Sequence, residues 1–424
     1  MTLHSPDEIT RHLFAKTTKG IKFGLDRIRA ASEKINNPHS AYESIHVAGT
    51  NGKGSTCAYL DSVIRAHGFK TGLFTSPHIV RFEERFIIDG RPVSTEAWME
   101  VYRDMATVIE TYGLTFFEAT TLIAFELFKR EKVDWAIFET GMGGRLDATN
   151  IITPKVVAIT TIAMDHEHYL GNDMASIVAE KLGIVKKNVP LVIAKPPQPA
   201  IEVIVKRHCA SLESPCITAA AGGAEACMTN GNTTGFTYKG HQYAIGLRGE
   251  FQVLNALVAL KTLECAGFCD EPALASGIAA AIVPGRFQVV ELNNRLVVFD
   301  VGHNPNAAEA FVKALKHHFD GLPICIVAGI MKDKDIGGIV QQYSKAASRF
   351  IFTQPKTIRS AAPEDIAARV PAGFKGPREC IPDVDKAIAA ALSGTEKVVC
   401  VAGSFFTVGE AMTALGIEPY RENQ

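Results

Sequence analysis

The sequence has no C-x-x-C pair, no run of about 20 apolar residues and almost no net charge. Its nine cysteines are scattered without a repeated spacing, so neither a zinc site nor a disulfide framework is indicated. We expect buried thiols in a reducing compartment. The missing apolar run excludes a transmembrane helix, and residues 1–20 lack the basic start and apolar segment of a signal peptide. A cytoplasmic protein without a membrane partner is therefore expected.

The net charge at pH 7 is −1, from 44 Lys and Arg residues against 45 Asp and Glu residues. This balance argues against a surface that binds nucleic acid, whereas a local basic site for an anionic small molecule is compatible with it. A chain of 424 residues, 47% of them hydrophobic, is long enough for two or three domains with buried cores.

Three glycines, Gly49, Gly52 and Gly54, fall within six residues of the stretch "HVAGTNGKGSTC". Backbone N–H groups at a strand-to-helix turn and the positive end of the helix dipole bind anions, and Lys53 adds a full charge. The spacing departs from the common nucleotide loop G-x-x-x-x-G-K-[ST]. A tight turn without a ligand is the alternative, but it does not explain the lysine. We expect a phosphate site, with contacts from Asn51, Gly52, Lys53, Gly54, Ser55 and Thr56.

Short apolar runs alternate with helix-length segments from residue 44 onward, which is typical of a parallel sheet covered by helices. The pattern weakens between Ala194 and Gly249, where short antiparallel strands are expected. A second α/β series begins near Arg286, after a predicted hinge at residues 282–288. The sequence thus predicts two α/β domains: residues 1–284, a P-loop ATPase-like parallel sheet with a small antiparallel addition, and residues 285–424, a Rossmann-like sheet.

Polar side chains follow several of the predicted strands. Ser76 follows "TGLFT", Glu139 ends "WAIFE", and Asp165 and His166 come just beyond "ITTIAM". The carboxyl ends of parallel strands meet at one edge of a sheet, where hard oxygen ligands could hold a phosphate-bound Mg²⁺ together with the Ser55 hydroxyl. Each has an alternative: a turn for Ser76, a cap of the glycine-rich turn for Glu139, and a structural histidine for His166. From its residue type alone, Lys181 is expected at the surface.

Eight segments resemble the Mur ligase superfamily, and most closely its dihydrofolate synthase/folylpolyglutamate synthase branch. In order they are "GTNGKGS", "TSPH", "ETGMGGRLDATN", "MDHEHYLG", "EKLGIVK", "PGRFQ", "DVGHNPNA" and "AGSFFTVGE". The resemblance implies an ATP-dependent amide ligase that joins L-glutamate to dihydropteroate and to the γ-carboxylate of folates through an acyl phosphate. It also implies a monomer with ATP and two Mg²⁺ ions.

The same resemblance implies roles for individual residues. Ser55, Ser76 and Glu139 fall on positions for one Mg²⁺, His166 on a ligand position for a second, and Lys181 on a lysine carried as a carbamate, which reverses the surface expectation. The catalytic positions are Lys53, Lys181, His166 and His303.

Asn255, Arg286 and Asp300 fall on ATP-contacting positions, and Ser404 is a weaker candidate for the glutamate side. Arg286 is expected to reach the phosphates when the domains close. A helix-face amide (Asn255) and caps of the helix near Pro305 (Asp300 and His303) are the alternatives.

The pterin side is expected in "IKFGLDR", "TFFEATT" and "RLDATN". Aromatic rings there offer flat surfaces, and Asp147 can accept hydrogen bonds from a pterin, although Phe23 and Phe117 are equally compatible with a core. Glu83, and Val301 with Gly302, depart from the residues usual in the family. The candidate pterin residues are Lys22, Phe23, Gly24, Leu25, Thr115, Phe116, Phe117, Glu118, Leu146, Asp147 and Ala148.

Three alternatives stay open at this point. A folylpolyglutamate synthase without the dihydrofolate synthase activity fits the same motifs. A peptidoglycan Mur ligase needs a further N-terminal domain for its nucleotide-sugar substrate, and the phosphate loop here begins at residue 49. A nucleotide-gated switch is the third, and it predicts no release of ADP that depends on glutamate.

Overall fold

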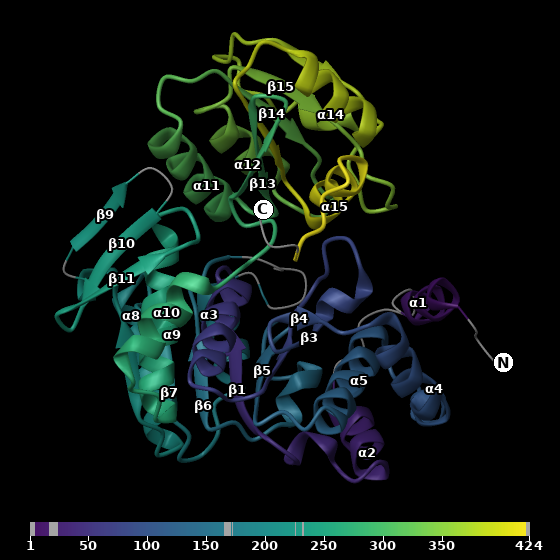
Figure 1. The fold of residues 1–424 in the computed structure, drawn as a ribbon, viewed down its shortest axis with the longest axis vertical. Helices are drawn as coiled ribbons and strands as arrows, with labels where there is room; N and C mark the ends of the chain where they lie inside the picture. Colours follow the sequence, from purple (N-terminus) through teal and green to yellow (C-terminus); the bar gives the residue numbers. More distant parts are fainter. Residues whose placement is uncertain are drawn as a thin grey trace. The chain divides into compact units, whose positions relative to one another are not determined.

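The computed structural model of the chain describes residues 5–16, 24–164, 171, 173–224, 226–230 and 233–420. The chain divides into two compact units, one of Met1–Ala226, Phe236–Ala244 and Val253–Ala281, and the other of Cys227–Gly235, Ile245–Gln252 and Ile282–Gln424. Each unit is an α/β structure with its own sheet, as the sequence predicts (Figure 1).

The first unit is built on an eight-stranded sheet in the order β4-β3-β2-β5-β1-β6-β7-β8. The six strands from β2 to β8 in that order are parallel, and β3 and β4 continue the sheet as antiparallel strands at one edge. Their bounds are β1 Glu43–Ala48, β2 Thr71–Phe74, β3 Phe86–Ile88, β4 Arg91–Pro92, β5 Trp135–Glu139, β6 Val156–Ile159, β7 Leu191–Ala194 and β8 Cys216–Ala219.

The central strands of this sheet are buried on both faces, which is why they appear in the sequence as continuous apolar runs. Figure 1 shows α9 and α10 beside α3, and α2, α4 and α5 gathered around the β3–β5 side. The helices are α1 Pro6–Ala15, α2 Asp26–Lys34, α3 Lys53–Ala66, α4 Thr95–Thr111, α5 Phe116–Arg130, α7 Met174–Leu182, α8 Pro199–Ser211, α9 Phe251–Ala266 and α10 Glu271–Ala280.

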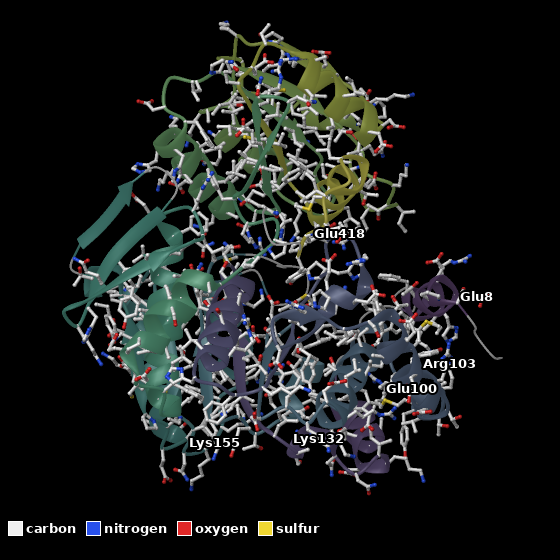
Figure 2. All side chains as sticks on the ribbon, viewed as in Figure 1. Glu8, Glu100, Arg103, Lys132, Lys155 and Glu418 are labelled. Atoms are coloured by element: carbon white, nitrogen blue, oxygen red, sulfur yellow. The ribbon has the colours of Figure 1, made fainter. Side chains whose placement is uncertain are left out.

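The edge at which the parallel strands begin is marked in Figure 2 by Lys132 and Lys155, which precede β5 and β6. The opposite, carboxyl edge carries the glycine-rich loop after β1, Ser76 after β2, Glu139 at the end of β5 and Thr160 after β6. Parallel pairing of β1 with β5 sets Val47 beside Glu139, so the loop and the carboxylate leave the sheet at the same level.

The second unit has a six-stranded sheet in the order β12-β13-β17-β14-β15-β16, in which only β12 is antiparallel to its neighbour. Its strands are β12 Gln288–Leu292, β13 Arg295–Asp300, β14 Ile324–Ala328, β15 Arg349–Phe352, β16 Arg378–Cys380 and β17 Val398–Ala402. Figure 1 shows α11 (Pro305–His318) and α12 (Ile336–Tyr343) on one face, and α14 (Val384–Ser393) and α15 (Phe405–Ala414) on the other. A short α13 (Pro363–Ala367) completes the helices.

The segment from Ala194 to Gly249 differs from the expectation of strands and turns alone. Residues 199–211 form α8, with Pro199 at its first position, where the missing N–H of proline has no cost. The strand after it, β8, joins the main sheet as a parallel edge strand. The expected antiparallel addition follows as a three-stranded sheet of β9 (Ala226–Asn230), β10 (Thr233–Tyr238) and β11 (His241–Ile245).

The cysteines that the structure describes are free thiols, but the expectation that they are buried is only partly correct. Cys57, Cys209, Cys325 and Cys400 are buried, whereas Cys265, Cys269 and Cys380 are exposed. The exposed ones lie near the end of α9, in the turn after it and on the edge strand β16. Within the described part of the chain, none of the helices combines the length and the apolar character needed to cross a membrane.

Candidate functional site

The loop from Gly49 to Gly52 lies against other backbone and side chains so closely that two of its positions require glycine. Gly49 has φ +152° and Gly52 has φ +86°. A Cβ atom at Gly49 would lie 1.8 Å from Oγ1 of Thr160, and one at Gly52 would lie 2.2 Å from Oδ1 of Asn255. Only glycine adopts these conformations without strain, so the two glycines set the path by which the chain enters α3.

Two threonines after β6 hold this loop in place. The hydroxyls of Thr160 and Thr161 donate to the carbonyl oxygen of Asn51 at 2.7 and 3.1 Å. The backbone N–H of Thr50 donates to the carbonyl of Thr161 at 2.8 Å, and the hydroxyl of Thr50 donates to the carbonyl of Ala163 at 3.0 Å. These threonines were not among the residues expected from the sequence, although the pair "TT" directly after an apolar run is a signal that could have indicated them.

Two lysines from distant parts of the sequence converge on the loop. Nζ of Lys53, on the first turn of α3, donates to the carbonyl oxygens of Gly49 at 3.1 Å and Thr50 at 3.3 Å. Nζ of Lys181, near the end of α7, donates to the same Gly49 oxygen at 2.9 Å. Lys181 is 3% exposed, so its placement at the surface from residue type alone is wrong. Two ammonium groups beside a helix N-terminus concentrate positive charge where a phosphate is expected.

Glu139 lies next to the first turn of α3 and to the turn after β2. Its Oε2 accepts a hydrogen bond from the backbone N–H of Ser76 at 3.1 Å, and a Cβ atom at Gly54 would lie 4.0 Å from the same oxygen. Glu139 is 4% exposed and Ser55 is 2% exposed. The buried Glu139 carboxylate and Ser55 hydroxyl and the half-buried Ser76 are hard oxygen donors at one edge of the sheet. They suit Mg²⁺, which takes few protein ligands and keeps waters or phosphate oxygens.

The second predicted metal position cannot be described in the same way, because His166 lies outside the described residues, as does Asp165. Within the described ranges, no group of three or more His, Cys, Asp or Glu side chains is arranged to hold a metal ion. The predicted site around Glu139 has a single carboxylate, so it would not count as such a group. Serine hydroxyls and ligand phosphates would supply its remaining oxygens.

Asn255 and Thr56 join α9 to the phosphate loop. The hydroxyl of Thr56 donates to the carbonyl of Asn255 at 3.5 Å, and Asn255 is 4% exposed with its amide against Gly52. The structure thus brings Asn255 to the loop, although it lies about 200 positions further along the chain in a segment without a strong motif.

The residues expected at the pterin side are spread over three local structures. Lys22 and Phe23 lie outside the described residues, and Gly24 (φ +129°) and Leu25 lead into α2. Thr115 caps α5 and forms a capping box with Glu118, which is also paired with Arg27 at 3.0 Å. Leu146 is half-buried and Ala148 is buried.

Phe116 and Phe117 have different surroundings. The Phe117 ring packs against Gly141, where a Cβ atom would lie 2.6 Å from it, and against Phe74 at 5.8 Å between centroids. The core alternative for Phe117 is therefore the one that its packing supports. The Phe116 ring stacks on Phe14 at 4.6 Å and has the Arg85 guanidinium 5.0 Å from its centroid.

Asp147 holds the turn from Gly141 to Thr149 together. Its Oδ2 accepts from the N–H groups of Gly141 at 2.8 Å and Met142 at 3.0 Å, and its Oδ1 accepts from the N–H of Thr149 at 3.0 Å and the Thr149 hydroxyl at 2.5 Å. Burial raises the pKa of Asp147, while these donors act in the opposite direction. The contact of Asp147 with a pterin stays a prediction, and its observed contacts are those of a turn-stabilising carboxylate.

The candidates in the second unit also lie together. Asp300, at the end of β13, accepts from the N–H groups of Phe287 at 3.1 Å and Gly302 at 2.8 Å. Burial raises the pKa of Asp300, and the nearby charge of Arg286 opposes the rise. The Arg286 guanidinium lies 5.2 Å from the Phe405 ring centroid, and the His303 ring lies 6.0 Å from the same ring. Asn304, rather than Asp300 or His303, caps α11.

Ser404 is the N-cap of α15. Its Oγ accepts from the N–H of Thr407 at 3.1 Å and lies 2.7 Å from the Thr407 hydroxyl, which in turn donates to the carbonyl of Gly329 at 2.9 Å. Ser404 is 2% exposed. These contacts give it a structural task, and its proposed contact with glutamate remains a prediction.

We expect Ser404→Ala to lower the free energy of unfolding by about 1 kcal/mol, because it removes the helix cap. Ser404→Asp, which can still cap the helix, is the matched control and is expected to lose less. Denaturant unfolding followed by circular dichroism measures the difference. Unchanged stability with a raised KM for glutamate would contradict the capping interpretation and assign Ser404 to the substrate.

Comparison with known proteins agrees with this arrangement. Residues 47–263 match the family model described as the Mur ligase middle domain, and residues 285–405 match that of the Mur ligase, glutamate ligase domain. The dihydrofolate synthase/folylpolyglutamate synthase of Escherichia coli is 33% identical over 410 residues, covering 94% of this chain and 92% of that protein.

Two solved structures extend the likeness to the fold. Mycobacterium tuberculosis folylpolyglutamate synthase complexed with ADP has a TM-score of 0.90 and 29% identity, covering 98% of this chain and 99% of that one. A bifunctional folylpolyglutamate synthase/dihydrofolate synthase with Mn, AMPPNP and L-glutamate bound has a TM-score of 0.85 and 30% identity, covering 98% of both chains. The chain therefore belongs to the Mur ligase family, in its dihydrofolate synthase/folylpolyglutamate synthase branch.

Proposed function

We propose that this protein ligates L-glutamate to dihydropteroate, and to the γ-carboxylate of folates, with conversion of ATP to ADP and phosphate. The observation that carries the proposal is the convergence of Lys53 and Lys181 on the loop after β1, with Glu139 beside the first turn of α3. Relatives named for both synthase activities support the pair of acceptors, and a related structure with AMPPNP and L-glutamate bound supports the other two substrates. We further propose a cytoplasmic monomer.

The chemistry proceeds in two displacements. In the first, a carboxylate oxygen of the acceptor bonds to the γ-phosphorus of ATP as the bond to the ADP oxygen breaks, giving an acyl phosphate. In the second, the amine nitrogen of glutamate bonds to the acyl carbon, phosphate leaves, and the nitrogen loses a proton. Both steps demand that anions approach each other, so positioning and charge neutralisation are what the protein has to supply.

The described residues are suited to these demands. Lys53 and the N–H groups of the loop neutralise the phosphates, and Gly49 and Gly52 allow the backbone to come close to them. Ser55, Ser76 and Glu139 would hold one Mg²⁺, and His166 with a carbamate on Lys181 a second. Bound magnesium supplies additional positive charge at the transferred phosphoryl group. A carbamate on Lys181 keeps one N–H, so the hydrogen bond to the Gly49 carbonyl is compatible with it.

The proposal is tested by measuring ADP release from the purified protein with ATP and Mg²⁺. We expect release only when both L-glutamate and a pterin acid are present, with dihydropteroate and tetrahydrofolate each tested as the acceptor. D-glutamate and pteroate carboxamide are the matched controls. ADP release without glutamate would support a nucleotide-gated switch, and turnover of tetrahydrofolate alone would limit the protein to folylpolyglutamate synthesis.

A further inference from the structure

Arg85 is a buried arginine beside the candidate site that none of the sequence motifs assigned to a ligand. It ends the short helix of residues Phe82–Arg85 and is 4% exposed. Its backbone carbonyl accepts from the N–H of Thr75 at 3.2 Å, so it lies directly across from the residue that precedes Ser76. Arg85 thus belongs to the same edge of the sheet as Ser76 and Glu139.

The guanidinium of Arg85 is held by neutral groups. Its Nε donates to Nδ1 of His78 at 2.9 Å, and its Cζ lies 5.0 and 5.9 Å from the ring centroids of Phe116 and Phe82. Across the described residues, the contacts of Arg85 are with His78, the two phenyl rings and the Thr75 N–H, and none is an ion pair with a carboxylate. A buried cation without a paired anion is costly, and proteins usually keep such a group where a ligand supplies the charge.

The two acidic residues nearest in the chain do not bond to the guanidinium. Both oxygens of Glu84 are taken by the backbone N–H groups of Ile79, Val80 and Arg81, at 2.7, 3.0 and 2.7 Å. Glu83 instead accepts from the Thr95 hydroxyl and the Trp98 indole. Burial lowers the pKa of Arg85 to about 10, and the charges of Glu84 and, to a smaller extent, Glu139 oppose this lowering, although neither carboxylate bonds to the guanidinium.

We propose that Arg85 binds the carboxylate of the pteroyl acceptor, the group that becomes phosphorylated, and so sets it beside the Glu139 metal position. This inference rests on the proposed function. A guanidinium matches a carboxylate with two parallel N–H donors, and the hydrogen bond to His78 fixes its plane. The Phe116 ring beside it, half-buried and stacked on the exposed ring of Phe14, offers an aromatic surface suited to the flat benzoate ring that carries this carboxylate.

The phosphates of ATP are the other anions that Arg85 could bind, but the structure favours the acceptor. The phosphate loop has its own cation in Lys53, whose hydrogen bonds go to backbone carbonyls of the loop. Arg85 lies against Phe116, which belongs to one of the segments that the sequence predicts to be the pterin side. An experiment can distinguish the two ligands, because a variant without Arg85 loses affinity only for the ligand that Arg85 binds.

The experiment is a cycle of two ligands and two proteins. Binding of dihydropteroate and of its neutral carboxamide is measured by calorimetry on wild type and Arg85→Met, with ADP and Mg²⁺ present. Wild type is expected to bind the acid at least about tenfold more tightly than the carboxamide, and Arg85→Met to bind both within about twofold. Arg103→Met, which removes the exposed arginine labelled on α4 in Figure 2, is the control and should keep the wild-type ratio.

The affinity for ADP is expected to stay within about twofold of wild type in Arg85→Met, and a large loss there would assign Arg85 to the nucleotide instead. An unchanged ratio of acid to carboxamide overturns the inference while leaving the proposed function intact. Wild type that fails to bind dihydropteroate counts against the proposed function itself. If Arg85→Met does not fold, Arg85→Gln enters the same cycle. A wild-type complex with the dihydropteroate carboxylate beyond hydrogen-bond distance of Arg85 also overturns it.

Discussion

Lys53→Met is expected to lower kcat by about 100- to 1,000-fold, the range typical of losing one group that stabilises charge in a transition state. Lys53 is on the first turn of α3, where its ammonium group lies 3.1 Å from the Gly49 carbonyl. From this position its ammonium group can stay close to the negative charge of the phosphoryl group during transfer. Methionine has a similar length but carries no charge. The rate of ADP release with saturating ATP, glutamate and dihydropteroate measures the loss.

The control for this substitution is Lys155→Met. Lys155 precedes β6 at the opposite edge of the sheet (Figure 2) and forms an ion pair with Glu43, in which both side chains are at least half exposed. Such pairs contribute little to stability, so the control should keep the wild-type kcat. Equal activity of the Lys53 and Lys155 variants would remove the phosphate role of the loop.

Lys181→Ala is the second substitution with a large expected effect, a fall in kcat of about 100-fold or more. If Lys181 acts as a carbamate, alanine removes an anionic metal ligand along with the hydrogen bond to Gly49. Formate or acetate, added at increasing concentration, should restore part of the activity, because a free carboxylate can occupy the space left by the side chain.

The rescue experiment distinguishes the two forms of the lysine. Restoration by methylamine instead of acetate would show that the ammonium form is the working one, and full activity of Lys181→Ala without additives would exclude both. The shorter alanine side chain also leaves a void near the loop, so the thermal midpoint of the variant is measured in parallel, and ADP binding confirms that the loop is intact.

The parts of the site that the sequence predicts are those in which local chemistry specifies local structure. Gly49 and Gly52 have the positive φ angles that a strand-to-helix turn requires, and Ser76 and Glu139 lie where apolar runs end. The order of apolar and helical segments also predicts the two sheets, because strands buried on both faces leave continuous apolar runs in the sequence.

The remaining parts depend on contacts between distant segments. The burial of Lys181 follows from the packing of α7 against the loop, and a lysine on a helix carries no local sign of this. Likewise Thr160 and Thr161 matter only because Asn51 lies opposite them, and Arg85 only because the acidic side chains near it in the chain bond elsewhere. Residues such as Thr115 and Ser404, in contrast, have a visible capping signal that competes with any assignment to a ligand.

The strand order has a consequence for how the protein is made on the ribosome. β5 is inserted between β1 and β2, and β6 pairs with the other side of β1. A nascent chain that ends before Trp135 therefore contains the glycine-rich loop but lacks β5, the strand that pairs with both β1 and β2. It also lacks Thr160 and Thr161, whose hydroxyls donate to the carbonyl of Asn51 in that loop. If this loop binds the nucleotide as proposed, we expect nucleotide affinity only after residue 161 has left the exit tunnel of the ribosome, and none in the first third of the protein alone.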